Sequence, residues 1–352
     1  MKISRPQPAG DRRPLVTVVV PCYNYGRYLP DAVQSITSQE GVDVEVIIVD
    51  DASTDGSQQV AQDLAAADDR IRLILHEQNK RHIATYNDGL REATGDYVVL
   101  LSADDLLAPG ALSRSSNLME RYPEVGMVYG YAADFEGDVP VERRDSETWS
   151  LWTGPQWIAK ISRRGRNMMF SPEVTLRRSV LEQLEGYDRD MPHSADMDMW
   201  MRAAALGGVG RINGPDQAYY RVHAANMHLT DYAGLIADAA ARRLTYDRFF
   251  AGSGATLPNA RRLQAAAHAA LARELMRAAC VALDQGDEIA GAGSAQIVEL
   301  ARDIWPAIEK DRLWRRYQRR LRNPAGRARR FIESRVEYRG PLRQSLWRRY
   351  GL

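Results

Sequence analysis

Short runs of β-branched and aliphatic residues recur early in the chain, and each is followed by a stretch with helical character. The runs are Leu15–Val20, Val44–Val49, Ile71–Leu75 and Tyr97–Leu101. A continuous apolar run of this length is typical of a strand that is buried on both faces, as in a parallel sheet. We therefore expect an α/β fold with a mostly parallel sheet, flanked by helices and joined by right-handed crossovers.

Helices are expected between these strands. They are predicted over Tyr28–Thr37, Ser57–Ala67, Ile83–Ala93 and Pro109–Arg121. Residues Ser53 to Ser57 offer N-cap groups for the second helix, and Gly95 is placed to end the third. Proline is favoured in the first turn of a helix, and Pro109 would lie in the first turn of the fourth helix. A fifth strand is expected over Gly126–Tyr131.

The pattern changes beyond the fifth strand. We interpret Glu136–Pro172 as connecting and acceptor-side structure, and Val174–Leu206 as mostly helical with a break around Tyr187–His193. Asp231–Ile304 is rich in alanine, which favours helices, with interruptions near Gly252–Pro258 and Gly286–Ser294. The chain thus divides into a flexible N-terminus (1–14), an α/β domain (15–228), an appended helical region (229–311) and an arginine-rich tail (312–352).

Several classes of protein fit the sequence poorly. No glycine-rich dinucleotide or P-loop signature is present, which disfavours dehydrogenases and P-loop NTPases. A net charge of +1 does not indicate a nucleic-acid partner. Cys22 and Cys280 form neither a disulfide framework nor a paired metal spacing, so a reducing compartment is expected. We find no secretory signal and no apolar span of membrane length.

Acidic pairs follow two of the predicted strands. Asp50 and Asp51 end the second strand, and Asp104 and Asp105 follow the fourth. Ligands of parallel sheets bind beyond the carboxyl ends of the strands, so both pairs should border one cleft. Carboxylates repel a diphosphate unless a divalent cation bridges them, which predicts Mg²⁺ or Mn²⁺ at Asp104 and Asp105. The alternative is that these residues only cap helices and turns.

The loop Pro21–Asn24 follows the first strand. Tyr23 could stack on a nucleobase, and Asn24 could hold either the loop or the nucleotide. Ordinary loop packing explains these residues equally well.

Several segments, in this order, resemble family 2 glycosyltransferases. They are Thr17–Asn24, Val46–Ser57, the series Asn79…Asn87-x-Gly89…Gly95-Asp-Tyr97, and Leu101–Asp105. The resemblance covers about Pro14 to Asn226. It implies the GT-A fold for residues 15–228, a nucleotide-diphosphate sugar as donor, and inversion of the anomeric centre.

The resemblance also implies roles for particular residues. Pro21, Tyr23, Asp50 and Asp51 would hold the base and ribose. Asp104, with Asp105, would meet the ribose and the metal-bound diphosphate.

A later segment, Ser194–Arg202, matches the acidic motif of the family and makes Asp196 the predicted base. Capping of the same helix is an alternative role that can coexist. Asp198 is expected to have a structural or acceptor-side role. His223, in a segment that resembles the end of the family's domain, would join the metal or remain structural.

The chain departs from the family pattern at three positions. Ser102 stands where Asp-x-Asp has its first acid, Ala195 where glutamate precedes the base, and Arg81 where glycine is common. The Gln-x-x-Arg-Trp signature of processive synthases is absent, which favours addition of a single sugar.

These observations predict an inverting, metal-dependent glycosyltransferase of the hexosyltransferase type. It would act in the assembly of a cell-surface polysaccharide or glycolipid, on a saccharide or lipid-linked saccharide acceptor. The alternative is a catalytically silent nucleotide-sugar-binding protein of the same fold. A nucleotidyltransferase would need a basic, glycine-rich loop at Pro21–Arg27, which the sequence lacks.

Between Arg312 and Arg349 the only acidic residues are Glu333 and Glu337, and aromatic residues interleave with the arginines. This composition suits an anionic membrane surface. We therefore expect a cytoplasmic protein, peripheral on the inner face of the membrane. Two other roles of the basic tail, a solvated helix face and a contact in a homo-oligomer, fit its composition as well as membrane binding does. Nucleic-acid binding fits less well, because the sequence has no recognition motif for it.

Overall fold

The computed structural model describes residues 1–7, 10, 12–143, 145–224, 226, 234–286, 288–322 and 348–349. The chain forms two compact units. The first comprises Met1–Trp157 and Met169–His223, and the second comprises Ile158–Met168 and Ala224–Leu352. A segment from the middle of the predicted α/β domain therefore belongs to the helical unit.

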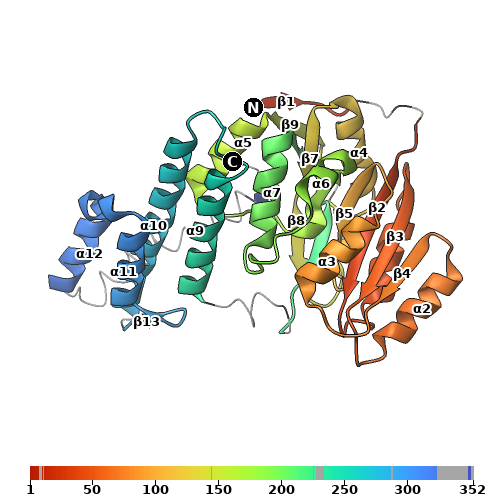
Figure 1. The fold of residues 1–352 in the computed structure, drawn as a ribbon, viewed down its shortest axis with the longest axis horizontal. Coiled ribbons are helices and arrows are strands. Elements are labelled where there is room, and N and C mark those ends of the chain that lie inside the picture. Colours follow the sequence, from red (N-terminus) through yellow and green to blue (C-terminus); the bar gives the residue numbers. More distant parts are fainter. Residues whose placement is uncertain are drawn as a thin grey trace. The chain divides into compact units, whose positions relative to one another are not determined.

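A nine-stranded sheet forms the centre of the first unit (Figure 1). Its strands are β1 (Lys2–Ser4), β2 (Leu15–Cys22), β3 (Asp43–Asp50), β4 (Ile71–Leu75), β5 (Tyr97–Leu100), β7 (Val125–Tyr129), β9 (Thr148–Trp152), β10 (Val174–Arg177) and β11 (Gly208–Asn213). Their order is β1-β9-β11-β7-β10-β5-β2-β3-β4. Only β9 and β10 run against the other strands of this described sheet, so the predicted mostly parallel sheet is confirmed.

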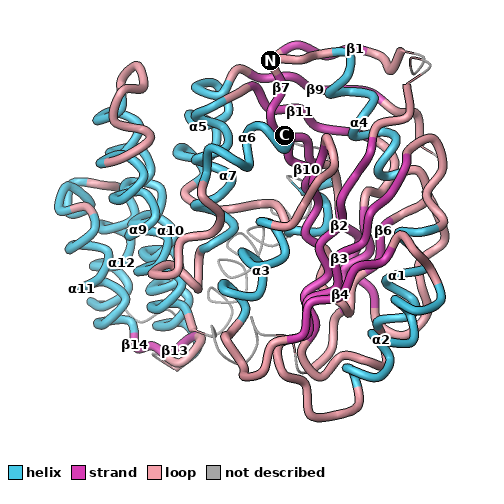
Figure 2. The backbone as a smooth tube through the Cα atoms, turned by 45° about the vertical axis from the view of Figure 1, so that its right-hand side comes forward, coloured by secondary structure: helices cyan, strands magenta, loops and turns pink. Residues whose placement is uncertain are grey.

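Helices cover both faces of the sheet. They are α1 (Leu29–Thr37), α2 (Ser57–Ala67), α3 (His82–Arg91), α4 (Ala111–Arg121), α6 (Arg178–Leu184) and α7 (Ala195–Leu206). Figure 2 shows α1 and α2 on one side of the strands and α3, α6 and α7 on the other. The helices predicted within the first 121 residues are confirmed, with shifts of one or two residues at their ends.

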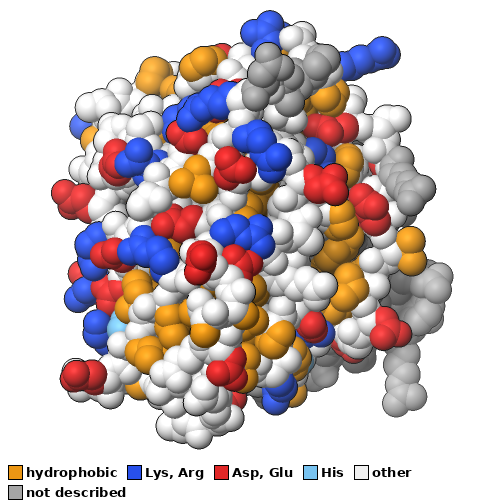
Figure 3. All heavy atoms as spheres, turned by 90° about the vertical axis from the view of Figure 1, so that its right-hand side faces the viewer, with side chains coloured by type: hydrophobic (Ala, Val, Ile, Leu, Met, Phe, Trp, Pro, Cys, Tyr) orange, Lys and Arg blue, Asp and Glu red, His pale blue; other side chains and the backbone are white. Residues whose placement is uncertain are grey.

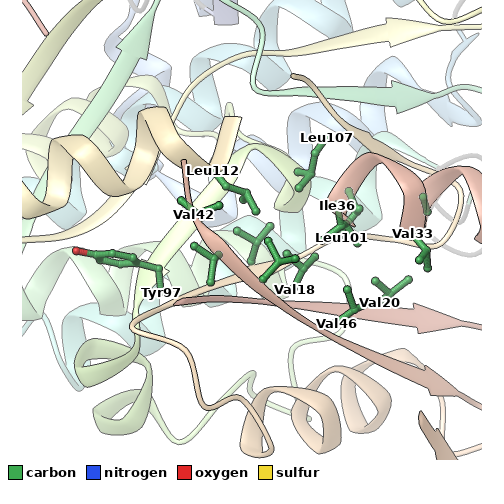
Figure 4. Close-up of a cluster of buried hydrophobic side chains, with 14 of the residues drawn as sticks. Val18, Val20, Val33, Ile36, Val42, Val46, Tyr97, Leu101, Leu107 and Leu112 are labelled. Atoms are coloured by element: carbon green, nitrogen blue, oxygen red, sulfur yellow. The ribbon is translucent and has the colours of Figure 1, made fainter. Parts of the chain in front are cut away.

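Alternate residues of β2 explain this layering. Val18 and Val20 point into a buried cluster with Val33 and Ile36 of α1 (Figure 4). Val19, between them, faces α3 on the other side, where a Cβ at Gly89 would lie 2.4 Å from its Cγ1. Only glycine allows this approach, and α3 therefore lies close against the sheet.

Two expectations are corrected by strand pairing. Lys2–Ser4, predicted as part of a flexible terminus, pair with Trp149–Leu151 of β9 as an edge strand. Val174–Arg177, predicted as helical, form β10, which pairs antiparallel with both β5 and β7. In each case hydrogen-bond partners that are distant in sequence override the local preference.

A small sheet brings distant segments of the first unit together. Its strands are β6 (Leu106–Leu107), β8 (Ala132–Phe135) and β12 (Ala218–Arg221), in the order β6-β12-β8. Because β12 pairs with β6, the residues just before Leu106 lie beside those at and after Arg221.

Helices form the second unit, as predicted. They are α9 (Leu235–Ala251), α10 (Ala260–Gln285), α11 (Ser294–Ile304) and α12 (Arg312–Arg322). Its other part is the C-terminal end of α5 (Gly154–Arg164). Breaks occur at both predicted places, the second with a hairpin of β13 (Glu288–Ile289) and β14 (Ala292–Gly293). No helix in the described part of the chain is both long and apolar enough to span a bilayer.

A buried arginine holds this unit together. Arg242 of α9 forms an ion pair with Glu274 of α10 at 3.0 Å and donates to the carbonyl oxygen of Gly165 at 2.9 Å. The side chain of Arg242 is 6% exposed. The segment after α5 is thus fixed to both helices.

Candidate active site

The first turn of α7 lies at the carboxyl end of the parallel strands. The helix passes through Gly207 into β11, which is parallel to β7. Because α7 packs on β7 before the chain turns back into β11, the helix runs against these strands. Asp196, its second residue, is therefore placed at the edge of the sheet where Asp51 and Asp104 also lie.

Asp196 is partly buried and is held by a tyrosine. The hydroxyl group of Tyr187 donates a hydrogen bond to its Oδ1 at 3.1 Å. Burial raises the pKa of Asp196 to about 6, and the hydrogen bond from Tyr187 opposes this rise. A carboxylate with such a pKa can accept a proton near neutral pH.

Tyr187 is itself fixed by Asn87 of α3. The amide of Tyr187 donates to Oδ1 of Asn87 at 2.7 Å, and Nδ2 of Asn87 donates to the carbonyl oxygen of Tyr187 at 2.9 Å. A Cβ at Gly186 would lie 2.4 Å from Oδ1 of Asn87, and Gly186 has a φ of +85°. The loop before α7 is thus clamped to α3, which packs close against the sheet at Gly89.

Asp198 has a structural role, which was one of its two predicted roles. Its Oδ2 accepts from Nε of Arg202 at 2.7 Å. The same guanidinium donates to the carbonyl oxygens of Leu184 and Gly186. Asp198 therefore orients an arginine that ties α7 to the loop carrying Tyr187.

Asp104 and His223 lie in contact although 119 residues separate them. Oδ2 of Asp104 is 2.9 Å from Nε2 of His223, and Ser102 donates to the other oxygen of Asp104. The ring of His223 stacks on Tyr28, with centroids 5.7 Å apart, and meets Tyr25 edge-on. Burial, followed by the charge of Asp104, raises the pKa of Tyr25 to about 12.

Asp105 is directed to the backbone of β12. Its Oδ1 accepts from the amide of Arg221 at 2.9 Å, and Nε of Arg221 donates to the carbonyl oxygen of Asp104. Burial, and then the charge of Asp104, raise the pKa of Asp105 well above its ordinary value. This exchange of hydrogen bonds joins the acidic loop to the segment that carries His223.

Two of the three predicted metal ligands, Asp104 and His223, lie where they could bind one divalent ion. Across the described ranges, no three His, Cys, Asp or Glu side chains are grouped to hold a metal ion. Asp104 and His223 are brought together, whereas the recorded hydrogen bond of the Asp105 carboxylate is to a backbone amide. Two adjacent protein groups fit an ion that takes its other ligands from phosphate oxygens and water.

Asp51 is held by a buried histidine. Its Oδ1 is 2.8 Å from Nδ1 of His76 and accepts from the backbone amide of Lys80 at 2.8 Å. On the other side of the ring, Nε2 of His76 is 3.1 Å from Asp88, which also pairs with the ammonium group of Lys80. Both hydrogen bonds of the Asp51 carboxylate go to Oδ1, which leaves Oδ2 for a ligand.

Asp50 and Asn24 hold their loops. Oδ1 of Asp50 accepts from the amide of Ser53, and Oδ2 is buried with no hydrogen-bond partner among the described residues. Oδ1 of Asn24 accepts from the backbone amide of Thr54, and the backbone amide of Asn24 donates to Oγ of Ser53. These contacts join the loop after β2 to the loop after β3.

The other predicted residues of the first loop lie beside them. Pro21 is half-buried and accepts through its carbonyl oxygen from the amide of Ala103, which ties this loop to that of Asp104. Tyr23 is 47% exposed, so its ring is accessible to a planar ligand.

Three residues that support the site were not among the predicted site residues. His76 directly follows β4, at the edge of the sheet where ligands of parallel sheets bind. Asn87 belongs to a segment that carried the family resemblance. Tyr187 was interpreted only as part of a break between helices, and no local pattern links it to Asp196.

Comparison with known proteins agrees with this architecture. The family model described as "Glycosyl transferase family 2" matches residues 17–184. An uncharacterized glycosyltransferase of Nostoc sp. is 31% identical over 219 residues, which is 61% of this chain and 67% of that protein. The chain thus spans about two thirds of the length of this relative.

Two solved structures share the fold. S. aureus TarS 1–349, in complex with UDP-GlcNAc, has a TM-score of 0.56 and 15% identity over 84% of this chain and 91% of that one. The mannosyltransferase PcManGT of Pyrobaculum calidifontis, with GDP-Man and Mn²⁺, has a TM-score of 0.51 and 23% identity. The match covers 87% of this chain and 89% of the PcManGT chain.

The sequence match covers the strands and loops that carry Asp51 and Asp104, and the similar structures share the GT-A fold. On these grounds the chain is a glycosyltransferase and belongs to glycosyltransferase family 2.

Proposed function

We propose that the protein transfers one sugar, with inversion, from a nucleotide-diphosphate sugar to a hydroxyl group of a saccharide or lipid-linked saccharide. The observation that carries this proposal is the partly buried Asp196, whose pKa is about 6 and whose orientation Tyr187 fixes. In an inverting transfer, a carboxylate removes the acceptor proton as the oxygen attacks the anomeric carbon opposite the leaving diphosphate. Asp196 has the pKa and the position for that task.

The surroundings of Asp196 support this role. Asn87 fixes both backbone polar groups of Tyr187, so the tyrosine hydroxyl has little freedom to leave Asp196. A base that is held in one orientation avoids reorganisation when the acceptor binds. We infer that Tyr187 and Asn87 are positioning residues for the reaction.

Asp104 and His223 are the proposed ligands of Mn²⁺ or Mg²⁺. When bound, such an ion stabilises the negative charge that develops on the leaving diphosphate. Ser102, in the place of the usual acid, donates to Asp104 and thereby orients it without adding charge. Asp105 would support Asp104 through Arg221 and serve as a ligand only if its side chain turns. The presence of Mn²⁺ in PcManGT is consistent with a divalent ion.

The nucleotide would lie over the loops after β2 and β3. Tyr23 offers an exposed ring for the base, and Oδ2 of Asp51 offers an acceptor for the base or ribose. Pro21, Asn24 and Asp50 shape these loops through their recorded contacts. The UDP-GlcNAc and GDP-Man in the two similar structures support a nucleotide-sugar donor of this class.

We further propose a place in the assembly of a cell-surface polysaccharide or glycolipid. The missing signature of processive synthases favours addition of one sugar over polymerisation. The proposed activity is of the hexosyltransferase type.

A catalytically silent protein that binds nucleotide sugars is the second candidate. It is favoured by Ala195, which stands where the family has glutamate before the base. Such a protein would bind the donor and would release no nucleotide.

A donor screen followed by an assay of transfer separates the two candidates. Thermal unfolding is measured with UDP-, GDP-, dTDP- and CDP-sugars, each with and without Mn²⁺. The donor that stabilises the protein is then used with saccharide acceptors, and nucleotide release is measured for the wild type and for Asp196→Asn. Transfer by the wild type, with donor binding but no transfer in the variant, supports the enzyme. Donor binding without turnover on any acceptor supports the silent protein.

A further inference from the structure

Helix α12 has two chemically distinct faces. Leu313, Tyr317 and Arg320 are buried against the unit. Arg312, Arg315, Arg319 and Arg322 are exposed, and we call these four residues the outer face of α12. At 100° per residue, their spacing of three, four and three places them within an arc of about 80°. The helix therefore presents a single row of guanidinium groups to solvent.

The inner face fixes α12 as a regular part of the second unit. Arg320 forms an ion pair with Asp284 of α10 at 3.1 Å, and both side chains are at most 10% exposed. The hydroxyl group of Tyr317 lies 3.2 Å from that of Ser294 in α11. The row of arginines is therefore held on a rigid support.

Three of the four arginines of the outer face lack the acidic partners that other arginines have. Within the described ranges, Arg315, Arg319 and Arg322 form no ion pair. In the first unit, by contrast, Arg70 and Arg72 pair with carboxylates. Figure 3 shows basic and acidic side chains interspersed on the face of the molecule turned to the viewer. Like charges three and four residues apart destabilise a helix, so an anionic partner would relieve this repulsion.

Charge is also segregated along the chain. Arg312–Arg349 contain fourteen arginines and two glutamates, yet the whole protein has a net charge of only +1. The part before α12 is therefore acidic overall. Such asymmetry indicates a polyanionic partner for the basic end and repulsion of the remainder from the same surface.

We propose that the outer face of α12 docks on an anionic membrane surface. The row of arginines extends over about 15 Å, at 1.5 Å per residue, and can meet the plane of lipid phosphates at several points. A guanidinium group can donate two parallel hydrogen bonds to the oxygens of one phosphate. At the same 100° per residue, polar Gln318 and Arg316 flank this face, so the contact would be made with headgroup phosphates rather than with acyl chains.

A membrane fits these features better than a nucleic acid. The row is short, and no nucleic-acid recognition motif accompanies it in the sequence. Docking would place the protein as a peripheral protein on the inner face of the cytoplasmic membrane. There it would have access to a lipid-linked acceptor, which is the only part of this inference that rests on the proposed function.

Binding of the full-length protein to lipid vesicles tests the proposal. Sedimentation with phosphatidylcholine vesicles, with and without phosphatidylglycerol, is compared for the wild type and for Arg315→Gln/Arg319→Gln. The matched control is Arg261→Gln/Arg262→Gln, which removes two exposed arginines from α10 of the same unit. We expect binding only to the anionic vesicles, weakened by added salt. The α12 variant should bind at least tenfold more weakly, and the control should bind like the wild type.

Several results would overturn the proposal. Equal binding by both variants would show that α12 does not provide the contact. Loss of RNA binding or of self-association in the α12 variant, with vesicle binding unchanged, would assign the face to that other partner. Far-ultraviolet circular dichroism checks that the variants fold. Transfer to a soluble acceptor should be unchanged in the α12 variant, so failure of docking and failure of catalysis are observed separately.

Discussion

Tyr187 donates its hydroxyl hydrogen to Oδ1 of Asp196 at 3.1 Å, from a loop that Asn87 fixes by two backbone hydrogen bonds. Two influences on the base are thereby balanced. Burial favours protonated Asp196, and the tyrosine hydroxyl favours the carboxylate. The resulting pKa of about 6 makes Asp196 ionised at neutral pH and still basic enough to accept a proton.

Removal of the tyrosine hydroxyl should therefore alter the pH dependence of transfer. Asp196 acts only as a carboxylate, so the rate of the wild type should fall as the pH decreases through about 6. In Tyr187→Phe the pKa of Asp196 should rise by about one unit, which moves the acidic limb of the kcat profile to higher pH. A lower kcat with an unmoved limb would mean that Tyr187 has only a packing role.

Asp196 should also cost stability when it is ionised. Its folded pKa of about 6 exceeds the ordinary value of 3.8, so the folded protein loses stability as the pH rises from about 4 to 6. Asp196→Asn avoids this loss. The variant should be more stable than the wild type at pH 8, by up to about 3 kcal/mol, and equally stable at pH 4. Denaturant unfolding at both pH values measures the difference, and the same difference at both would exclude ionisation as its cause.

The metal ligands can be identified by titration with Mn²⁺. Chelation with EDTA should abolish transfer, and added Mn²⁺ should restore it. In Asp104→Asn and His223→Gln, the Mn²⁺ concentration for half-maximal activity should rise about tenfold or more, because each removes a group from the pair.

Asp105→Asn is the matched comparison for the metal titration. Asp105 accepts a hydrogen bond from the Arg221 amide, so the Mn²⁺ requirement of the Asp105→Asn variant should stay near that of the wild type. An increase as large as that in Asp104→Asn would instead identify Asp105 as a ligand.

His76 should affect donor binding more than the chemical step. His76→Ala removes the ring that lies between Asp51 and Asp88, so Asp51 loses a fixed orientation. We expect the KM for the donor to rise about tenfold while kcat changes little. His268→Ala is the control, because His268 also contacts an aspartate, Asp247, but lies in the helical unit. A fall in kcat at saturating donor would argue against this role.

Two adjacent arginines of α9 provide a test of how the helical unit is stabilised. Arg242→Met removes the buried guanidinium and leaves Glu274 with its ion pair to Arg166, so it should destabilise the protein by about 3 kcal/mol. Arg243 is more exposed, so Arg243→Met should cost less than about 1 kcal/mol. Denaturant unfolding compares the two, and equal effects would contradict a special role for the buried network.

Local sequence determined the first half of the fold. Apolar runs such as Leu15–Val20 are followed by amphipathic segments, and this alternation permits little besides strands and helices in an α/β sheet. The helical unit was equally predictable from its alanine content and its glycine breaks. The arginine-rich segment was recognisable from composition, although its residues 323–347 and 350–352 lie outside the described part of the chain.

Pairing between distant segments decided the remaining strands. Val174–Arg177 became a central strand because β5 and β7 both offer hydrogen bonds to it, and Lys2–Ser4 became an edge strand on β9. A four-residue segment has too weak a local preference to indicate either outcome.

The same distinction applies to the site. The acidic residues at the ends of β3 and β5 could be assigned to one site from the sequence, because the carboxyl ends of parallel strands lie at one edge of the sheet. The contacts that define their chemistry were not visible in the sequence. His223 reaches Asp104 across 119 residues, and Tyr187 meets Asp196 from a loop that Asn87 holds. Sequence thus specified which groups could do the chemistry, whereas tertiary packing decided which of them touch and which are buried. Contact and burial set orientation and pKa, and neither is a property of local sequence.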